Sequence, residues 1–170
     1  MEIKLYIANL GKYNEGFLVG EWFTLPIDFE EVVEKIGLNA EYEEYAIHDY
    51  EAPFYIGEYE SLDSLNEIAE RLSTLNDETE VEAITSVMNN DSSIDIDEAM
   101  DMLENSEILF YYDCKDMTDV AYEVVESCGL LDNVPNNLRN YFDYEAFGRD
   151  LNIEGTWIQL NNNVYIEVCN

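Results

Sequence analysis

The sequence is poor in positive charge. Its 170 residues include only 7 lysines and arginines and one histidine, against 39 aspartates and glutamates, which leaves a formal net charge of −32. A surface this negative repels the phosphates of nucleic acids and the headgroups of anionic membranes, and it attracts basic protein surfaces. We therefore expect partners among basic proteins, with no nucleic acid and no membrane among them.

Other scarcities narrow the class of protein further. No run of about 18 apolar residues is present, so no membrane-spanning helix is expected. The opening residues Met1 to Leu5 lack the basic and apolar regions of a signal peptide. The three cysteines, Cys114, Cys128 and Cys169, are scattered, which is typical of reduced thiols. Together these features indicate a cytoplasmic protein.

Motifs for catalysis or metal binding are also lacking. His48 is the only histidine and has no candidate nucleophile near it, so a structural role is favoured. The glycines Gly11, Gly16 and Gly20 do not lead into the Gly-Lys-Ser/Thr of a phosphate-binding loop. The segment 91–101 is rich in aspartate but lacks the central glycine and closing glutamate of an EF-hand. We expect no enzyme, metal or other cofactor; a metal-dependent hydrolase using this segment is the enzyme alternative.

The residues that are present are sufficient for a folded core. Hydrophobic residues make up 47% of the chain and aromatic residues 13%, whereas disordered acidic chains have few of either. Solubility alone asks for a net charge of only about 2 to 8 in magnitude. The excess therefore needs another explanation. Adaptation to salt is one, and a surface that occupies the binding site of a polyanion is the one that we favour.

Local patterns predict an α+β protein of three modules. Residues 1–60 and 105–170 mix strands with helices, whereas 61–104 lack glycine and proline and show helical periodicity throughout. We expect this helical module to lean on its neighbours, because it is small. The predicted strands are Ile3–Asn9, Phe17–Thr24, Tyr45–Tyr50, Ile108–Tyr112, Thr156–Leu160 and Val164–Val168.

Helix signals are clearest at three places. Asp28 is a predicted N-cap, followed by Phe29, Val32, Val33 and Ile36 on one buried face and by a stop at Gly37. Asp116 is predicted to cap a helix that buries Val120, Ala121, Val124 and Cys128 and stops at Gly129. Pro135 suits the first turn of a further helix, in a segment that continues through Tyr141, Tyr144 and Phe147. Trp22 and Trp157 are predicted core residues.

The acidic residues follow a spacing of i, i+4, i+7 on three predicted helices, which places each trio on one helix face. The trios are Asp63, Glu67 and Glu70; Asp97, Asp101 and Glu104; and Asp119, Glu123 and Glu126. An ordinary solvated face explains one such row, but three rows with almost no lysine favour a functional surface. Three bases stand in favourable i, i+4 order with an acid and are predicted to be neutralised locally: Lys35 with Glu31, Arg71 with Glu67, and Arg149 with Glu145.

Several long stretches are distinctive: Leu5 to Gly16 (LYIANLGKYNEG), Leu18 to Phe23 (LVGEWF), Pro26 to Glu31 (PIDFEE), Glu43 to Glu51 (EEYAIHDYE) and Leu138 to Leu151 (LRNYFDYEAFGRDL). They resemble the ArdA family of antirestriction proteins. The resemblance spans nearly the full length. It is weakest over 61–104, which match chiefly by acidity and helical pattern.

The resemblance implies both an architecture and a function. ArdA proteins are encoded on plasmids and conjugative transposons, and they are elongated three-domain homodimers that mimic bent B-form DNA. They occupy the DNA-binding groove of type I restriction–modification enzymes, formed by a methyltransferase core with its DNA-specificity subunit, and so protect incoming DNA. The family's antirestriction motif falls here at 123–135. We therefore expect an elongated, dimeric, non-enzymatic inhibitor; the alternative is a mimic directed at another DNA-binding protein, such as a nucleoid protein or repressor.

Two sets of residues are the candidates for these contacts. The carboxylates expected to replace phosphates are Glu30, Glu34, Asp63, Glu67, Glu70, Asp97, Asp101, Glu104, Asp119, Glu123 and Glu126. The aromatic residues expected at the dimer interface, on the C-terminal module, are Tyr141, Tyr144 and Phe147.

Overall fold

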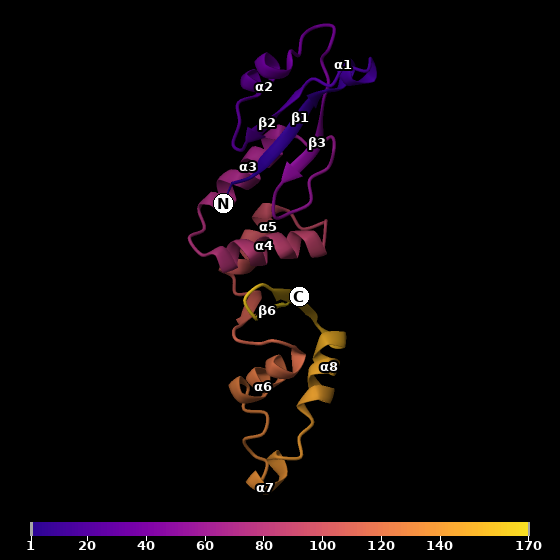
Figure 1. The fold of residues 1–170 in the computed structure, drawn as a ribbon. Coiled ribbons are helices and arrows are strands. Elements are labelled where there is room, and N and C mark those ends of the chain that lie inside the picture. Colours follow the sequence, from indigo (N-terminus) through magenta and orange to yellow (C-terminus); the bar gives the residue numbers. More distant parts are fainter. Residues whose placement is uncertain (1, 170) are drawn as a thin grey trace. The chain divides into compact units, whose positions relative to one another are not determined.

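The computed structural model describes residues 2–169, which form a mixed α+β protein with eight helices and two three-stranded sheets (Figure 1). The α+β class is therefore confirmed. The chain divides into two compact units, Met1–Val81 and Glu82–Asn170. Because the boundary falls inside the predicted helical module 61–104, the division into three modules stays a prediction.

The first unit contains β1 (Lys4–Asn9), α1 (Leu10–Asn14), β2 (Gly20–Thr24), α2 (Phe29–Ile36), β3 (Tyr45–Glu51) and α3 (Leu62–Ser73). Helix α4 (Glu78–Asn90) begins in this unit and continues into the next. The second unit then adds α5 (Ile96–Glu104), β4 (Ile108–Tyr111), α6 (Met117–Ser127), α7 (Asn136–Arg139), α8 (Tyr144–Glu154), β5 (Thr156–Leu160) and β6 (Val164–Val168).

The first sheet is antiparallel, with strand order β2-β1-β3. Helix α2 packs on β1 and β2, and buries Val32 and Ile36. Helix α3 is tied to the loop before α2 by Asn66, whose amide exchanges two hydrogen bonds of 2.8 Å with the backbone of Ile27. The sequence prediction for α2 is confirmed at both ends. Asp28 accepts a hydrogen bond from the Glu30 N–H, and Gly37 takes the left-handed conformation with φ of 68°.

One short helix was not expected from the sequence. The loop predicted to follow β1 contains α1, and the strand predicted from Phe17 begins only at Gly20. The cause is Asn9, which is fully buried. Its Oδ1 accepts a hydrogen bond from the Lys12 N–H at 3.0 Å, which caps α1, and its Nδ2 donates to the carbonyl of Ile36 at the end of α2. One amide thus joins a strand and two helices.

The second sheet is antiparallel, with strand order β4-β6-β5. On one face, Ile166 packs in a cluster with Val87 of α4 and Met102 of α5. On the other face, Tyr165 packs with Cys114 and with Val120 of α6. The sheet is therefore covered on both faces.

The last two strands of the second unit form a hairpin that is tied to α4. The strands predicted at Thr156–Leu160 and Val164–Val168 are confirmed as β5 and β6, and they pair as a hairpin with positive φ at Asn162 and Asn163 in its turn. Glu82 at the N-terminal end of this unit accepts two hydrogen bonds from Asn161, from its N–H at 2.8 Å and its Nδ2 at 2.6 Å, which fixes α4 to the hairpin.

The predicted extent of the helix that begins near Pro135 was wrong. It ends at Arg139, and a new helix, α8, begins at Tyr144. Two polar groups separate the helices. The Arg139 guanidinium donates back to the carbonyls of Asp132 and Val134, and Asp143 caps α8 by accepting a hydrogen bond from the Ala146 N–H. Close packing of α8 on the start of α6 depends on Gly148, where a Cβ would collide with the Met117 carbonyl.

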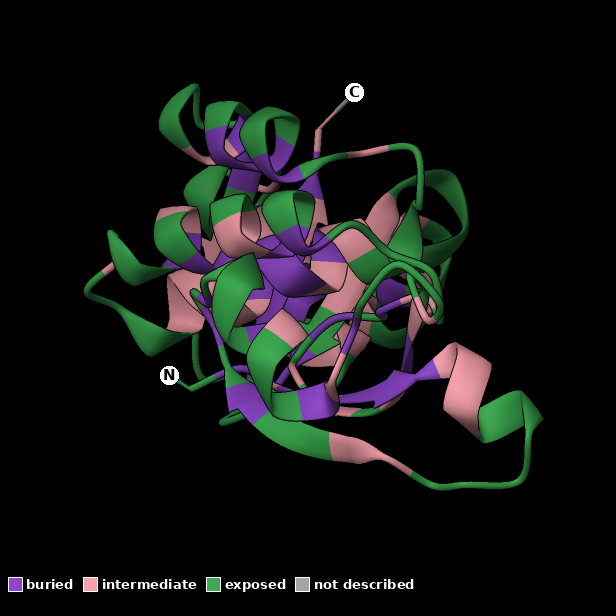
Figure 2. Cartoon of the chain, turned by 90° about the horizontal axis from the view of Figure 1, so that it is seen from above, coloured by how far each residue is buried: buried purple, intermediate pink, exposed green. Residues whose placement is uncertain are grey.

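Several predicted core positions were also wrong. In the second unit, Val125 is buried in place of Val124, which is half-buried, and Cys128 is exposed. The exposed side chains in the first unit include Phe29 and Trp22. Figure 2 shows the general arrangement, in which helices carry a buried band on one side and an exposed band on the other.

Candidate functional site

The acidic row of α3 lies opposite the buried side of that helix. Its buried side chains are Leu62, Leu65, Ala69 and Leu72. Asp63, Glu67 and Glu70 are all exposed. With a rise of about 1.5 Å per residue, their axial separations are about 6 and 4.5 Å, comparable to the spacing of about 3.4 Å between phosphates on one DNA strand. The row thus presents three carboxylates to solvent from one rigid helix.

The second unit carries the other two rows. Asp97, Asp101 and Glu104 of α5 are exposed, and so are Glu123 and Glu126 of α6. Helices α5 and α6 pack on opposite faces of the second sheet, so the sheet separates their rows. The α5 row and the α6 row therefore do not form one continuous surface.

Asp119 differs from the other members of the α6 row. It is half-buried, and its Oδ2 accepts a hydrogen bond from the Lys115 N–H at 2.9 Å. This contact holds the turn before α6, where Asp116 also caps the helix by accepting hydrogen bonds from the Thr118 and Asp119 N–H groups. Asp119 is thus partly engaged in local structure.

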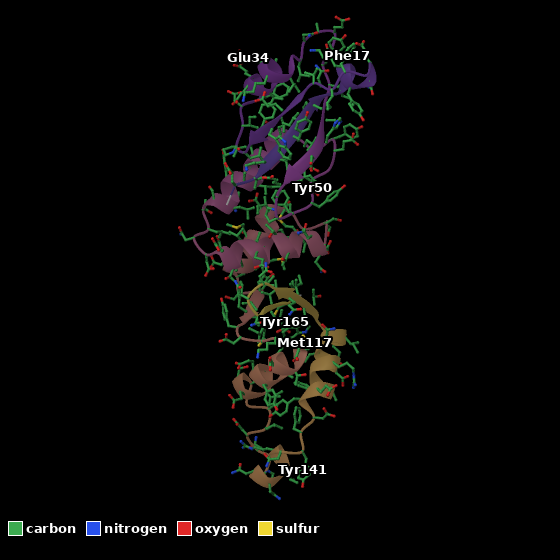
Figure 3. The ribbon with its side chains drawn as sticks, in the orientation of Figure 1. Phe17, Glu34, Tyr50, Met117, Tyr141 and Tyr165 are labelled. Atoms are coloured by element: carbon green, nitrogen blue, oxygen red, sulfur yellow. The ribbon has the colours of Figure 1, made fainter. Side chains whose placement is uncertain are left out.

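The two candidate carboxylates of α2 lie on its solvent-facing surface. Glu30 and Glu34 are exposed, and Figure 3 marks Glu34 on α2. Their neighbour Glu31 instead forms an ion pair of 2.9 Å with Lys35, as the spacing predicted. Lys35 also lies 3.7 Å from Glu21 of β2, so this cation is held between two carboxylates.

Basic side chains are similarly neutralised elsewhere. Lys4 pairs with Glu51 at 3.2 Å and with Glu2 at 3.4 Å, and hydrogen bonding to these carboxylates raises the pKa of Lys4. Arg149 pairs with its neighbour Asp150, and not with Glu145 as predicted. The predicted pair of Glu67 with Arg71 stays a prediction. Much of the sparse positive charge is thus consumed within the molecule.

Sequence reasoning missed one surface feature, the open face of the first sheet. Trp22 was predicted in the core, but 42% of its surface is exposed. Its ring meets that of Tyr6 edge-on, with centroids 5.6 Å apart. The signal lay in the neighbouring Phe23, which is buried: consecutive strand residues face opposite sides, so only one of the two aromatic residues can face a core on one side of the sheet.

The predicted dimer residues differ in how freely they could meet a partner. Tyr141 is 84% exposed, next to α7 (Figure 3). Tyr144 is stacked on Tyr122 of α6, with ring centroids 3.7 Å apart, and Phe147 packs against Phe142. Tyr144 and Phe147 therefore also hold α8 to its own chain.

The two segments for which the sequence favoured no functional site, around His48 and at 91–101, make local contacts. His48 meets the ring of Tyr13 edge-on at 4.7 Å. In the aspartate-rich segment, Asp91 accepts hydrogen bonds from the N–H and the hydroxyl of Ser93, which lower the pKa of Asp91. Over residues 2–169, no group of three His, Cys, Asp or Glu side chains is placed to hold a metal ion. No helix in this part of the chain combines the length and hydropathy that spanning a membrane requires.

These features define a strongly acidic α+β protein with carboxylates ranged along exposed helix faces. The chain belongs to the ArdA family of antirestriction proteins, because the family model matches residues 5–166. The resemblance inferred from the sequence is thereby confirmed. A comparison with curated proteins finds no match.

Proposed function

We propose that this protein is an antirestriction inhibitor that acts by mimicking DNA. It binds in the DNA-binding groove of a type I restriction–modification enzyme, made by the methyltransferase core with its DNA-specificity subunit, and keeps DNA out. It acts without catalysis in the cytoplasm, where it protects incoming plasmid or conjugative-transposon DNA. Membership of the ArdA family supports the antirestriction role.

The acidic rows on α3, α5 and α6, exposed except at the half-buried Asp119, carry this proposal. Each row contains a like-charge pair at i, i+4: Asp63 with Glu67, Asp97 with Asp101, and Asp119 with Glu123. Such pairs cost about 0.2–0.5 kcal/mol each, so the repulsion within them does not favour folding. Duplex DNA carries one charge per about 1.7 Å, so a net charge of −32 corresponds to about 54 Å of duplex. A basic groove built for DNA accounts for both observations.

The proposal includes a homodimer. Two copies would present roughly twice the charge, on the order of three turns of duplex by the same conversion. The exposed ring of Tyr141 is the proposed point of contact; Tyr144 supports it by stacking on Tyr122 of α6, and Phe147 by packing against Phe142. Sedimentation of the wild type and of Tyr141→Ser tests this contact. If Tyr141 joins the two copies, the variant should have the lower average mass at equal concentration.

A competition experiment tests the proposed function. A purified type I methyltransferase, with its specificity subunit, is bound to a labelled duplex carrying its site, and the protein is titrated in. We expect release of the duplex at near-stoichiometric protein, whereas polyglutamate of equal total charge should release little. If the methyltransferase keeps its DNA while an unrelated nucleoid protein or repressor releases its own, the target is that second class of protein.

Salt dependence provides a second readout of the same complex. A DNA mimic that replaces phosphates should bind with a logarithm of affinity that falls linearly with the logarithm of salt concentration, as DNA binding does. For a few contacts, the slope per phosphate predicts an affinity about tenfold lower at 200 mM than at 50 mM salt. An affinity that does not change over this range would contradict phosphate replacement.

A further inference from the structure

The first sheet has an open face whose composition follows from its strand register. Side chains of directly paired residues in antiparallel strands share one face of the sheet. Trp22 pairs with Tyr6, and Tyr6 pairs with Asp49, so these three form one row across the sheet. The neighbouring row contains Lys4 and Glu51. In Figure 1, α3 passes behind these strands.

A glycine shapes this face. The Tyr6 ring lies over Gly20, where an added Cβ would sit 3.0 Å from the ring and 2.8 Å from the Ile7 carbonyl oxygen. Without a side chain at this position, the Tyr6 ring can lie on β2 and meet Trp22 edge-on. The Tyr6 ring therefore lies directly against the backbone of β2, and Trp22 keeps much of its side chain exposed to solvent.

The electrostatics of the face are one-sided. Asp49 is exposed, and its Oδ1 accepts a hydrogen bond from the Tyr50 N–H at 2.9 Å; its Oδ2 makes no hydrogen bond within residues 2–169. Lys4 is the base on this face, and it is held by Glu51 and Glu2. The surface therefore combines an exposed aromatic ring with an available carboxylate and no available positive charge.

We infer that this face, formed by Trp22, Tyr6 and Asp49, is a docking site for an arginine side chain presented by a basic partner protein. A guanidinium is planar, stacks on aromatic rings and donates two parallel hydrogen bonds to a carboxylate, whereas the lysine ammonium is a compact point charge. Charge complementarity selects this occupant, because a second copy of the chain would bring another acidic surface, with 39 acidic residues against 7 bases.

This inference deepens the proposed function, on which it rests for the identity of the partner. Phosphate replacement by acidic rows treats arginine and lysine of the partner alike, as cations. The open face adds a contact that distinguishes them. The affinity for a partner therefore depends on whether its groove carries an arginine at the position that meets this face.

Fluorescence of Trp22 tests the site without any restriction enzyme. The chain has two tryptophans, so a Trp157→Phe variant leaves Trp22 as the sole reporter. Hexa-arginine and hexa-lysine carry equal charge and are titrated in separately; binding elsewhere on the acidic surface does not report through this ring. We expect hexa-arginine to reach half-maximal change at a concentration about two- to fivefold lower than hexa-lysine, the effect of one additional exposed hydrogen bond to the Asp49 carboxylate.

Matched charge variants provide the control. Asp49→Asn should abolish the preference for arginine, whereas Glu43→Gln, which removes one exposed charge from the same unit, should leave it intact. Circular dichroism verifies that both variants fold. Equal midpoints for the two peptides, or a preference that survives Asp49→Asn, would overturn the inference.

A second arm separates this inference from the proposed function. In the methyltransferase competition, Asp49→Asn should weaken binding about two- to fivefold more than Glu43→Gln, through the loss of one hydrogen bond to the carboxylate. Equal effects of the two variants on a methyltransferase that binds the wild type would overturn the docking site while leaving the function standing. A methyltransferase that ignores the wild type would overturn the function, and the peptide titration would still decide the inference.

Discussion

The two sheets of this protein have the same number of strands and the same antiparallel pairing, yet only one of them is enclosed. The second sheet packs Ile166 against α4 and α5 on one face and Tyr165 against α6 on the other. The first sheet buries Leu5 on one face and leaves Trp22 exposed on the other. In the second unit, the helices are thus the surface that a partner meets, whereas in the first unit a sheet face is also accessible.

The central strands carry this difference in their residues. In β6, Val164, Tyr165 and Ile166 are buried in succession, as in a strand that has a core on both sides. In β1, Lys4 and Tyr6 are partly exposed and alternate with buried Leu5 and Ile7, as in a strand that has a core on one side. The alternation at the start of β1 is therefore a physical signature of the open face.

The largest expected effect contrasts a core residue of the enclosed sheet with a residue of the open face. Ile166 is fully buried, so Ile166→Ala should lower the free energy of unfolding by about 2–5 kcal/mol through lost burial and a cavity. Trp22→Leu should cost less than about 1 kcal/mol, because part of its ring already faces water and Leu retains apolar area. Urea unfolding measures both. A Trp22→Leu variant as unstable as Ile166→Ala would show that the open face is part of the core.

The next effect contrasts the acidic rows of the two units. Reversing Asp63, Glu67 and Glu70 to lysine should weaken inhibition, and a triple reversal of the α5 row should do the same. Exposed charge pairs contribute about 0.2–1 kcal/mol each, so we expect about a 1.4- to fivefold loss per residue and rough additivity. Competition against a methyltransferase measures this. One carboxylate whose reversal abolishes inhibition, with the fold intact, would contradict a distributed phosphate mimic.

The fold could be predicted from the sequence where a strong hydrophobic periodicity lay between clear capping residues. Helix α2 is an example, because Asp28 and Gly37 mark its two ends and Val32 and Ile36 its buried side. Helix α1 could not be predicted in this way. It is too short to show a period, and its formation depends on contacts of Asn9 with α2, far away in the sequence.

The candidate site was predictable only in part. Spacing alone placed Asp97 and Asp101 on an exposed helix face, because the residues buried between them define the opposite side. The sequence could not show that Asp119 is engaged with the backbone of Lys115, since that contact depends on the turn before α6. Nor could it show Trp22 exposed, because exposure there depends on which face of the sheet the helices cover.

Added salt should raise the free energy of unfolding, because both units contain like-charge pairs whose repulsion it screens. The screening length falls from about 30 Å at 0.01 M to about 3 Å at 1 M salt, so repulsion along the acidic rows weakens. Relief of three such pairs corresponds to a gain of about 1 kcal/mol in the free energy of unfolding. Urea unfolding of Trp157→Phe and of Trp22→Phe, each with one tryptophan, follows the two units separately. A loss of stability with added NaCl, in either unit, would contradict self-repulsion on that unit's helices.

The smallest expected effect concerns a tyrosine of the enclosed sheet. Burial first, and then the hydrogen bond that its hydroxyl donates to Glu167 at 2.9 Å, raise the pKa of Tyr111 in the folded protein. The unfolded chain therefore releases this proton near pH 10, while the folded protein still holds it. Since the folded state then binds more protons, stability is fully present below about pH 10 and falls as pH rises above it. Tyr111→Phe should lose stability less steeply than the wild type between pH 10 and 11 in urea unfolding. Equal slopes would mean that the Tyr111 hydroxyl is as free to ionise in the enclosed sheet as in the unfolded chain.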